Sequence, residues 1–225
     1  FLMTTVLGQK PVQTRPLSVL TLNVNGASSR IRRERLLQYL STLPHDVLLL
    51  QEAHATPETQ KYWTQTWQQL VGPEARAYYS HGTQACCGVA TLIRTKHKVQ
   101  VQHQDKHGRE LAIRLDDMDL TIWNIYAPNN TDPLFFHFMT QQDMQKKIII
   151  GGDFNVVMDI DKDRRSPRPG AAATQRATFL NSMTESGWSD LWRKYNPDEL
   201  RYSCQRGEYA SRLDYIFVTD NLLGN

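Results

Sequence analysis

The chain has 225 residues, of which 26 are Lys or Arg and 23 are Asp or Glu, so its formal net charge is +3. This length is enough for one large domain with its own core, and the mildly basic balance is compatible with a polyanionic partner. We expect no membrane partner, because no apolar run approaches the length of a membrane span, and free thiols at Cys86, Cys87 and Cys204, because their spacing is not that of a zinc site.

The first 129 residues read as short strands with two helices among them. Residues 1–16 carry Gly8, Pro11 and Pro16 without periodicity, and we expect a loose N-terminal arm or an expression remnant there. Alternating or continuous apolar runs predict strands, and leucines at helical spacing or a leading proline predict helices. The predicted strands are 17–24, 46–51, 75–80, 86–94, 97–104, 109–115 and 119–126, and the predicted helices are 30–42 and 57–71.

The second half continues the same alternation. Thr131-Asp132-Pro133 predicts a helix start, followed by a buried stripe made of Leu134, Phe135, Phe138 and Met139. Thr174 is expected to cap another helix that Gly187 ends. Two last strands, near 200–205 and 211–218, flank a hairpin at 205–208. Many short strands with few helices indicate an α/β or α+β domain built on packed sheets.

A carboxylate and a carboxamide follow the apolar run Ile148–Ile150, in the sequence Gly-Gly-Asp153-Phe-Asn155. Side chains two residues apart on an extended segment point the same way, so we expect these two to converge on one spot. An acceptor-only group beside a group that both donates and accepts is suited to orienting a water molecule against an anion.

Other polar side chains stand where apolar strands end. Strand-end polar groups gathered on one edge are where open sheets place their sites, and carboxylates with amides nearby suit a hard cation such as magnesium. The candidates are Asn23, Glu52, Tyr126, Asp214 and the Asp153/Asn155 pair.

Five motifs in this order resemble the endonuclease/exonuclease/phosphatase superfamily, and within it the endonuclease domain of LINE-type (non-LTR) retrotransposons. They are Leu-Asn-Val-Asn-Gly (22–26), Gln-Glu-Ala-His (51–54), Tyr-Ala-Pro-Asn (126–129), Gly-Gly-Asp-Phe-Asn (151–155) and Ser-Arg-Leu-Asp-Tyr (211–215). The resemblance runs from about residue 17 to 218 and implies a four-layered α/β sandwich, in which two packed mixed β-sheets are flanked by helices.

Carried over by this resemblance, Glu52 is a ligand of Mg²⁺, for which Mn²⁺ can substitute, and Asn23 helps to arrange metal and phosphate. Asp153 orients and deprotonates the attacking water. Asn155 and Tyr126 donate hydrogen bonds to the phosphate.

Asp214 belongs, by the resemblance, to a dyad whose second member is a histidine in a Ser-Asp-His motif on a final strand. None of the seven histidines follows Asp214. Either the given sequence stops before the final strand or the dyad is incomplete. We favour the first alternative, and expect 17–225 to be a single endonuclease domain without its final strand, with a Ser-Asp-His sequence beyond residue 225.

Surface loops hold the duplex in relatives, and three candidates follow. Arg164, Arg165 and Arg168 lie in the loop after the Asp153 motif, and the hairpin from Ser203 to Ser211, bearing Arg206, corresponds to one that enters the minor groove. His54 and Asn129 match polar positions beside the centre. Phosphate contacts position DNA, whereas a hairpin can sense groove width and deformability.

The sequence thus predicts a magnesium-dependent endonuclease that nicks one strand of double-stranded DNA. By resemblance alone, the nick leaves a 3′-hydroxyl that primes reverse transcription during retrotransposon integration, the full protein is fused to a reverse transcriptase, and it acts in the nucleus. Two alternatives stay open: an abasic-site repair endonuclease or other phosphatase of the superfamily, and a DNA-targeting module that binds without cutting.

Overall fold

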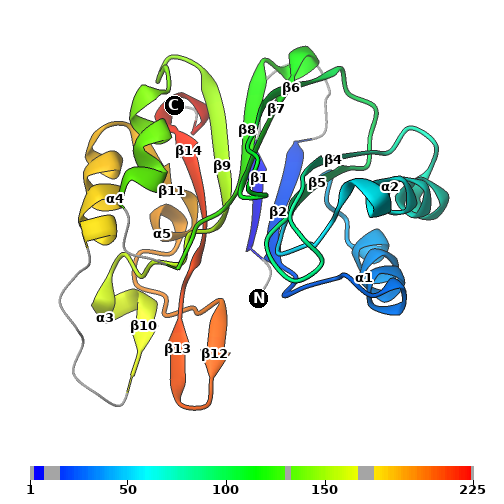
Figure 1. Ribbon diagram of the computed structural model, residues 1–225. Coiled ribbons are helices and arrows are strands. Elements are labelled where there is room, and N and C mark those ends of the chain that lie inside the picture. The colour runs from blue at the N-terminus through cyan, green and yellow to red at the C-terminus, as the bar shows by residue number, and fades with distance from the viewer. Residues whose placement is uncertain (1–2, 8–15, 130–132, 167–174, 224–225) are drawn as a thin grey trace.

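Two β-sheets pack face to face, with helices on both outer sides, in a computed structural model that describes residues 3–7, 16–129, 133–166 and 175–223 (Figure 1). This is the four-layered α/β sandwich expected from the sequence. No helix in the described part of the chain is long and apolar enough to cross a membrane.

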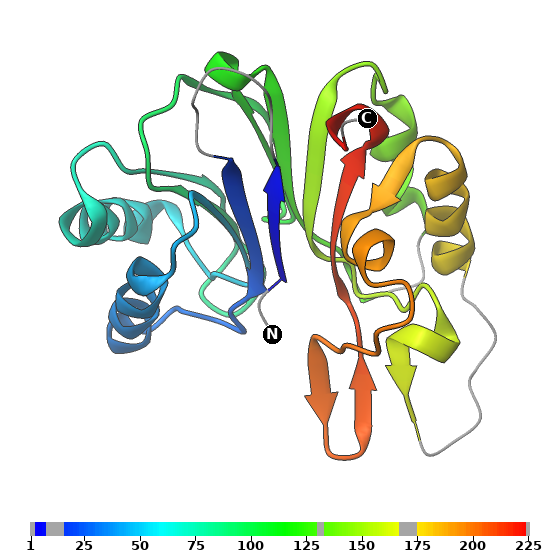
Figure 2. The ribbon, with the colours of Figure 1, turned by 180° about the vertical axis from the view of Figure 1, so that it is seen from behind.

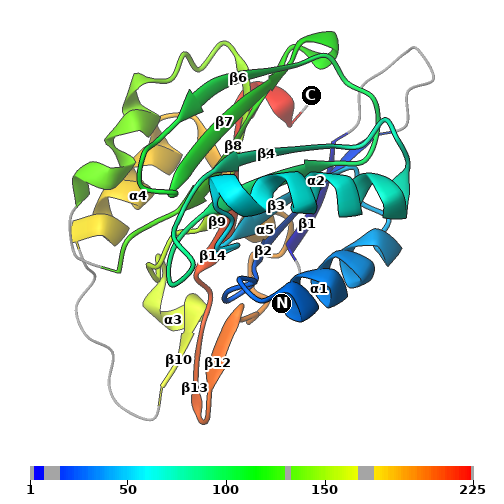
Figure 3. The same ribbon diagram turned by 45° about the vertical axis from the view of Figure 1, so that its right-hand side comes forward.

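The first sheet is built from the N-terminal half in the order β1-β2-β3-β5-β4. Its strands are β1 (Met3–Leu7), β2 (Leu17–Asn23), β3 (Val47–Gln51), β4 (Arg76–Ser80) and β5 (Val89–Ile93). Helices α1 (Arg30–Thr42) and α2 (Pro57–Val71) cover its outer face (Figure 3). Only β2 and β3 run parallel. The loose arm expected at 1–16 is wrong for Met3–Leu7, which pairs antiparallel with β2 along five residues because the β2 edge offers unpaired backbone groups.

The second sheet has the order β11-β14-β9-β8-β7-β6. Its strands are β6 (Val99–Gln104), β7 (Glu110–Leu115), β8 (Leu120–Tyr126), β9 (Lys147–Asp153), β11 (Trp188–Asp190) and β14 (Asp214–Thr219). The short helices α3 (Ile160–Asp163) and α5 (Leu191–Tyr195) and the longer α4 (Gln175–Glu185) lie on its side of the molecule (Figure 2). The central pair, β8 and β9, is parallel.

Apolar side chains form three layers that follow from this stacking. All five residues of β3 are buried because the strand is covered on both faces. Val47 and Leu49 pack between the two sheets, whereas Leu48 and Leu50 pack toward α1 and α2. Gly151 lets the sheets approach closely, since a Cβ there would lie 2.6 Å from Leu49 Cδ1. The third layer fills the space between the second sheet and its helices.

A small third sheet projects from the body and is visible at the bottom of Figure 1. It consists of β10 (Arg164–Arg165), β13 (Tyr209–Ser211) and β12 (Cys204–Arg206). The single strand predicted at 211–218 is wrong, because the chain changes partners within it. β13 pairs with β10 and β12, and β14 pairs with β9.

The segment Pro133–Gln141 is a 3-10 helix, and the buried stripe predicted for it is right for Met139, partly right for the half-buried Phe135 and Phe138, and wrong for Leu134. Phe136 and Met139 are the buried residues, whereas Leu134 is 71% exposed. A spacing of three is what a 3-10 helix presents on one face, since it has three residues per turn. The predicted start at 131–132 and the expected cap at Thr174 lie outside the described residues.

The predicted strand 86–94 begins later than expected, at Val89. Cys87 has a φ of 63°, in the left-handed region, which a strand does not accommodate. Cys86 is exposed and Cys87 is buried in the turn before β5, and all three cysteines are free thiols.

Candidate active site

Three candidate side chains lie in one row across the second sheet. Asp153 ends β9, and its register partners are Tyr126 at the end of β8 and Asp214 at the start of β14. Neighbouring strands lie about 5 Å apart, so register alone brings these residues together. The prediction that strand-end polar groups meet at one edge is confirmed for Tyr126 and Asp153. Asp214, expected at the C-terminal end of a strand, instead begins β14, and it reaches the same edge because β14 runs antiparallel to β9.

The first sheet supplies the other half of the site. The Asn23 amide nitrogen donates to Glu52 Oε1 at 2.8 Å and to Asp153 Oδ2 at 2.9 Å, so one carboxamide bridges the two sheets. Glu52 follows β3 with a φ of 51°, a conformation uncommon for residues other than glycine. Asn23, Glu52, Asp153, Tyr126 and Asp214 therefore form one polar cluster, which we call the carboxylate centre.

Burial sets the electrostatics of Asp153, which is 6% exposed. Desolvation raises the pKa of its carboxyl above the ordinary value, while hydrogen bonds from the Asn23 side chain and the Asn155 amide oppose that rise. The Glu52 charge raises this pKa further, and the Arg176 cation lowers it. The carboxylate is thus a stronger base than one in water.

Asp214 is also buried, with 8% of its surface exposed. Desolvation, followed by the charge of Asp153, raises its pKa to about 7, and a hydrogen bond with Ser203 works in the opposite direction. Its Oδ1 is buried and finds no hydrogen-bond partner among the residues that the structure describes. A buried acceptor of this kind calls for a donor.

Oxygen-bearing groups of the carboxylate centre suit a hard divalent cation. Within the described residues, no three His, Cys, Asp or Glu side chains are placed to share a metal. Magnesium requires no such cage, since it keeps several waters and is usually held by one or two carboxylates. Glu52 and Asp153 bring two carboxylates to one amide, and the pKa of Asp153 is raised first by burial and then by the charge of Glu52. The residues therefore fit the predicted metal.

Tyr126 is held as a hydrogen-bond donor beside Glu52. Burial and its hydrogen bond with Glu52 raise the pKa of the phenol well above 10, so it keeps its proton. The guanidinium of Arg109 lies 5.0 Å from the centre of the Tyr126 ring and donates to the Tyr126 carbonyl oxygen at 3.1 Å. Arg109 therefore fixes the ring.

Asn155 lies beside Asp153 for a reason other than strand alternation. The strand ends at Asp153, and Asn155 has a φ of 49°, so the expectation of two side chains on one extended segment is wrong. Instead, the Asn155 backbone N–H donates to Asp153 Oδ1 at 2.9 Å, and its side-chain amide donates to the Ala127 carbonyl at 2.7 Å. These two hydrogen bonds form a polar turn that brings Asn155 beside Asp153. The preceding Gly151 and Gly152 do not predict this turn.

The hairpin residues divide between two roles. Asn129 and Asn155 line a cavity of about 370 Å³ together with Arg206, Tyr209 and Ser211, so the hairpin adjoins the carboxylate centre. Ser203, expected to contact DNA, instead accepts hydrogen bonds from the backbone N–H groups of Leu213 (2.9 Å) and Asp214 (3.1 Å). Its hydroxyl holds Asp214 in place.

Three of the four remaining DNA-binding candidates lie in the described part of the chain. Arg164 and the exposed Arg165 form β10, and Arg165 lies 5.6 Å from the Tyr202 ring centre. Arg168 lies outside the described residues. His54 packs against Gly26, and its buried Nε2 has no partner within the described part of the chain.

Two supporting features escaped the sequence analysis. Arg176 of α4 is 3% exposed and donates to the carbonyl oxygens of Pro128 (2.8 Å) and Phe154 (2.7 Å), which joins two of the motif loops. Gln51 and Asn124 are fully buried between the sheets, and the Gln51 amide donates to Asn124 Oδ1 at 2.8 Å. Nothing in the sequence marks Arg176 as a supporting residue. Gln51 and Asn124, by contrast, could have been noticed as polar residues inside apolar strands.

Comparisons with known proteins identify the family and the fold. The sequence profile of the Endonuclease/Exonuclease/phosphatase family matches residues 20–224. The chain is 30% identical over 222 residues to the "Transposon TX1 uncharacterized 149 kDa protein" of Xenopus laevis. The aligned region covers 92% of this chain but only 16% of that protein. It is 20% identical over 229 residues to an exodeoxyribonuclease of Bacillus subtilis, with 92% of this chain and 89% of the relative covered.

Solved structures share the fold at low sequence identity. An AP endonuclease from Archaeoglobus fulgidus superposes with a TM-score of 0.72 at 19% identity, over 91% of this chain and 87% of its own. The APE2 catalytic domain of Xenopus laevis gives a TM-score of 0.69 at 20% identity, over 90% and 82%. At these identities the likeness establishes the fold alone.

Proposed function

Because the chain belongs to the Endonuclease/Exonuclease/phosphatase family, a family of nucleases and phosphatases, we propose that it is a magnesium-dependent endonuclease that nicks one strand of double-stranded DNA. The observation that carries the proposal is the bridge from Asn23 to both Glu52 and Asp153, beside Tyr126 and Asp214. Groups from both sheets surround one point, as hydrolysis of a single phosphodiester requires.

Asp153 is the residue suited to act on the attacking water. Its raised pKa makes it a better proton acceptor, and its bonds from Asn23 and from the Asn155 N–H fix the carboxylate. Glu52 and Asn23 would hold the magnesium ion, which when bound stabilises the charge that builds on the phosphate and on the leaving 3′ oxygen.

The remaining groups are donors or charge-setting neighbours. Tyr126 stays protonated and offers an O–H, and the Asn155 amide keeps a second N–H beyond the one given to Ala127. Asp214, with a pKa of about 7 and an Oδ1 that has no partner among the described residues, is placed to accept a hydrogen bond. In a dry centre such oriented donors are worth far more than in water.

We propose further that the nick leaves a 3′-hydroxyl for a reverse transcriptase encoded in the same protein, acting in the nucleus on chromosomal DNA. Support comes from the transposon relative, of which this chain spans only 16%. A protein of that length has room for other domains beside this one.

Incubating supercoiled plasmid with the chain and Mg²⁺ or Mn²⁺ tests the nuclease. Conversion to the open circle is expected for the wild type and for Asp161→Ala, which alters an exposed carboxylate nearby, and not for Asp153→Ala. A polymerase should extend the nicks directly if they end in a 3′-hydroxyl. Equal nicking by wild type and Asp153→Ala would reject the proposed role of Asp153.

Abasic-site cleavage is the second candidate, because two of the structural neighbours are described as AP endonucleases. A duplex with one synthetic abasic site, cut there while an intact duplex of the same sequence survives, would favour repair. DNA binding without cutting under any divalent ion would instead favour the targeting module.

A further inference from the structure

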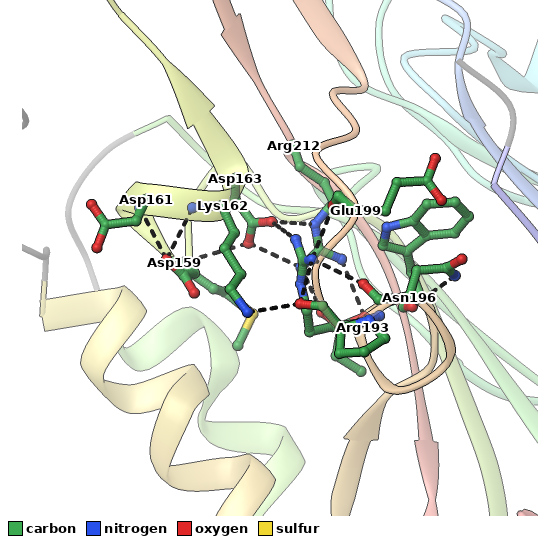
Figure 4. A network of polar contacts seen from close by, with 12 residues as sticks. Asp159, Asp161, Lys162, Asp163, Arg193, Asn196, Glu199 and Arg212 are labelled. Atoms are coloured by element: carbon green, nitrogen blue, oxygen red, sulfur yellow. Dashed lines mark hydrogen bonds and ion pairs between the residues drawn. The ribbon is translucent and has the colours of Figure 1, made fainter.

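A buried network of two arginines and two aspartates lies where the third sheet joins the body (Figure 4). Its members are Asp163 at the end of α3, Asp190 at the end of β11, Arg193 in α5 and Arg212 between β13 and β14. Asp163 has no exposed surface, and Arg212 is 1% exposed. None of the four belongs to the carboxylate centre.

Arg212 is joined to Asp163 by three hydrogen bonds. Its Nε and Nη2 donate to the two carboxylate oxygens of Asp163 at 2.8 and 2.9 Å, and its backbone N–H donates to the Asp163 carbonyl at 2.8 Å. The same guanidinium donates to both oxygens of Asp190, at 3.2 and 2.7 Å. Only the planar fork of arginine can bridge two carboxylates in this way.

Arg193 extends the network to the loop that leads into the hairpin. Its Nη2 donates to Asp163 Oδ1 at 2.6 Å. Its Nη1 donates to the backbone carbonyls of Asn196, Pro197 and Glu199, at 3.0, 3.2 and 3.0 Å. The Arg193 side chain therefore bonds three carbonyls of the segment that leads to β12.

The network touches both sides of the third sheet. Asp163 immediately precedes β10, which carries Arg164 and Arg165. Arg212 follows β13 and stands two residues before Asp214, and its guanidinium lies 4.4 Å from the ring centre of Tyr215 in β14. The elements proposed to grip DNA and a residue of the carboxylate centre are thus fixed to the same buried ions.

A buried ion network is an expensive way to stabilise a fold. Desolvating the charges offsets most of their attraction, and apolar residues of similar volume often serve as well or better. What oppositely charged, multiply bonded side chains supply is a defined geometry between the segments they join. Here those segments are α3 with β10, β11 with α5, the 196–199 loop, and the β13–β14 junction.

We propose that the Asp163–Arg212 pair, with Asp190 and Arg193, positions the β10–β13–β12 sheet relative to Asp214 and thereby determines which phosphodiester of a bound duplex reaches the carboxylate centre. These are positioning residues, and the inference rests on the proposed DNA-nicking function. Loosening the network lets the hairpin settle on the duplex in several registers, so cuts spread over more positions.

The test maps cuts made by the full chain on an end-labelled duplex of a few hundred base pairs. Arg212→Lys keeps the charge but loses the fork, and Arg193→Gln releases the 196–199 loop. Lys162→Gln is the matched control, since it removes a cation that bonds the same loop at Pro197 (2.7 Å) but is half-buried and is not one of the four network residues. Each reaction is run below the unfolding temperature measured for that variant.

The readout is the ratio of cutting at the preferred position to cutting at the median position. This ratio is taken within one reaction, so it does not depend on how much of a variant is folded. We expect it to fall roughly tenfold in Arg212→Lys and Arg193→Gln, equivalent to about 1.4 kcal/mol of discrimination, and to stay unchanged in Lys162→Gln.

Two outcomes overturn the inference while leaving the nuclease intact: an unchanged ratio in both network variants, even with slower cutting overall, or a wild-type chain that cuts with no preference. Absence of cutting by the wild-type chain, and also by a form extended at its C-terminus to carry the expected Ser-Asp-His sequence, would instead contradict the proposed function.

Discussion

Replacing Asp214 by asparagine is expected to make the protein more stable at alkaline pH while abolishing its activity. The folded protein holds this carboxyl at a pKa of about 7, against an ordinary value of 3.8, chiefly because burial disfavours the charged form. Since the folded-state pKa is the higher one, the neutral acid favours the fold. That contribution is complete below the unfolded pKa and is lost as the pH rises through about 7.

The size of the effect follows from the shift. At about 1.4 kcal/mol per pH unit, the displacement of about three units corresponds to ~4 kcal/mol, of which roughly 3 kcal/mol falls between pH 5 and pH 8. Asparagine is neutral at pH 5 and at pH 8, so it makes no such pH-dependent contribution to the unfolding free energy. The wild type should therefore lose about 3 kcal/mol of unfolding free energy relative to Asp214→Asn over this interval.

Urea unfolding of both proteins at pH 5 and pH 8, with a chelator present, measures this difference. Asp161→Asn, at an exposed position, serves as the control and should follow the wild type. Parallel pH profiles for wild type and Asp214→Asn would refute the reasoning, because they would mean that the buried carboxylate ionises without penalty.

Three further predictions concern the surroundings of the centre. Arg176→Met should lower kcat by roughly tenfold to a hundredfold with little change in KM, because the loops at Pro128 and Phe154 lose their common hydrogen-bond donor. Arg176→Lys should recover part of the lost kcat, and steady-state kinetics in which only KM shifts would contradict this prediction. Gly152→Ala should cost about 3 kcal/mol or more, since its Cβ would overlap a backbone oxygen of the adjacent strand, and urea unfolding close to wild type would show that reading to be wrong. If DNA binding neutralises roughly six phosphates, affinity should fall on the order of a thousandfold from about 50 to 200 mM salt. Neutralising Arg164 and Arg165 together should reduce the slope of log affinity against log salt concentration, and an affinity that does not depend on salt would argue against electrostatic DNA binding.

Patterns with local causes were read correctly from the sequence. The helix Pro57–Val71 was predicted with its observed bounds because a proline at its first turn and a glycine after its last residue mark both ends. The meeting of Tyr126 and Asp153 followed from strand ends, since parallel strands in register place their C-terminal ends at one edge, whereas Asp214 joins them from the start of an antiparallel strand.

Features that depend on tertiary partners were not read from the sequence. Ser203 and Arg212 act through residues 10 and 49 positions away, and nothing in the sequence pairs them. The division of the last predicted strand into β13 and β14 likewise arises because the two halves pair with different sheets. The left-handed turn at Asn155 was missed because strand alternation was extended past the end of β9.

The claim at the centre of this account is that Asn23, Glu52 and Asp153 surround one cation and one phosphodiester. Crystals soaked in Mn²⁺ and measured at its absorption edge test it directly. We predict an anomalous peak within coordinating distance of Glu52 that disappears in Glu52→Gln. A peak elsewhere on the molecule, or none there at saturating Mn²⁺, would contradict the account.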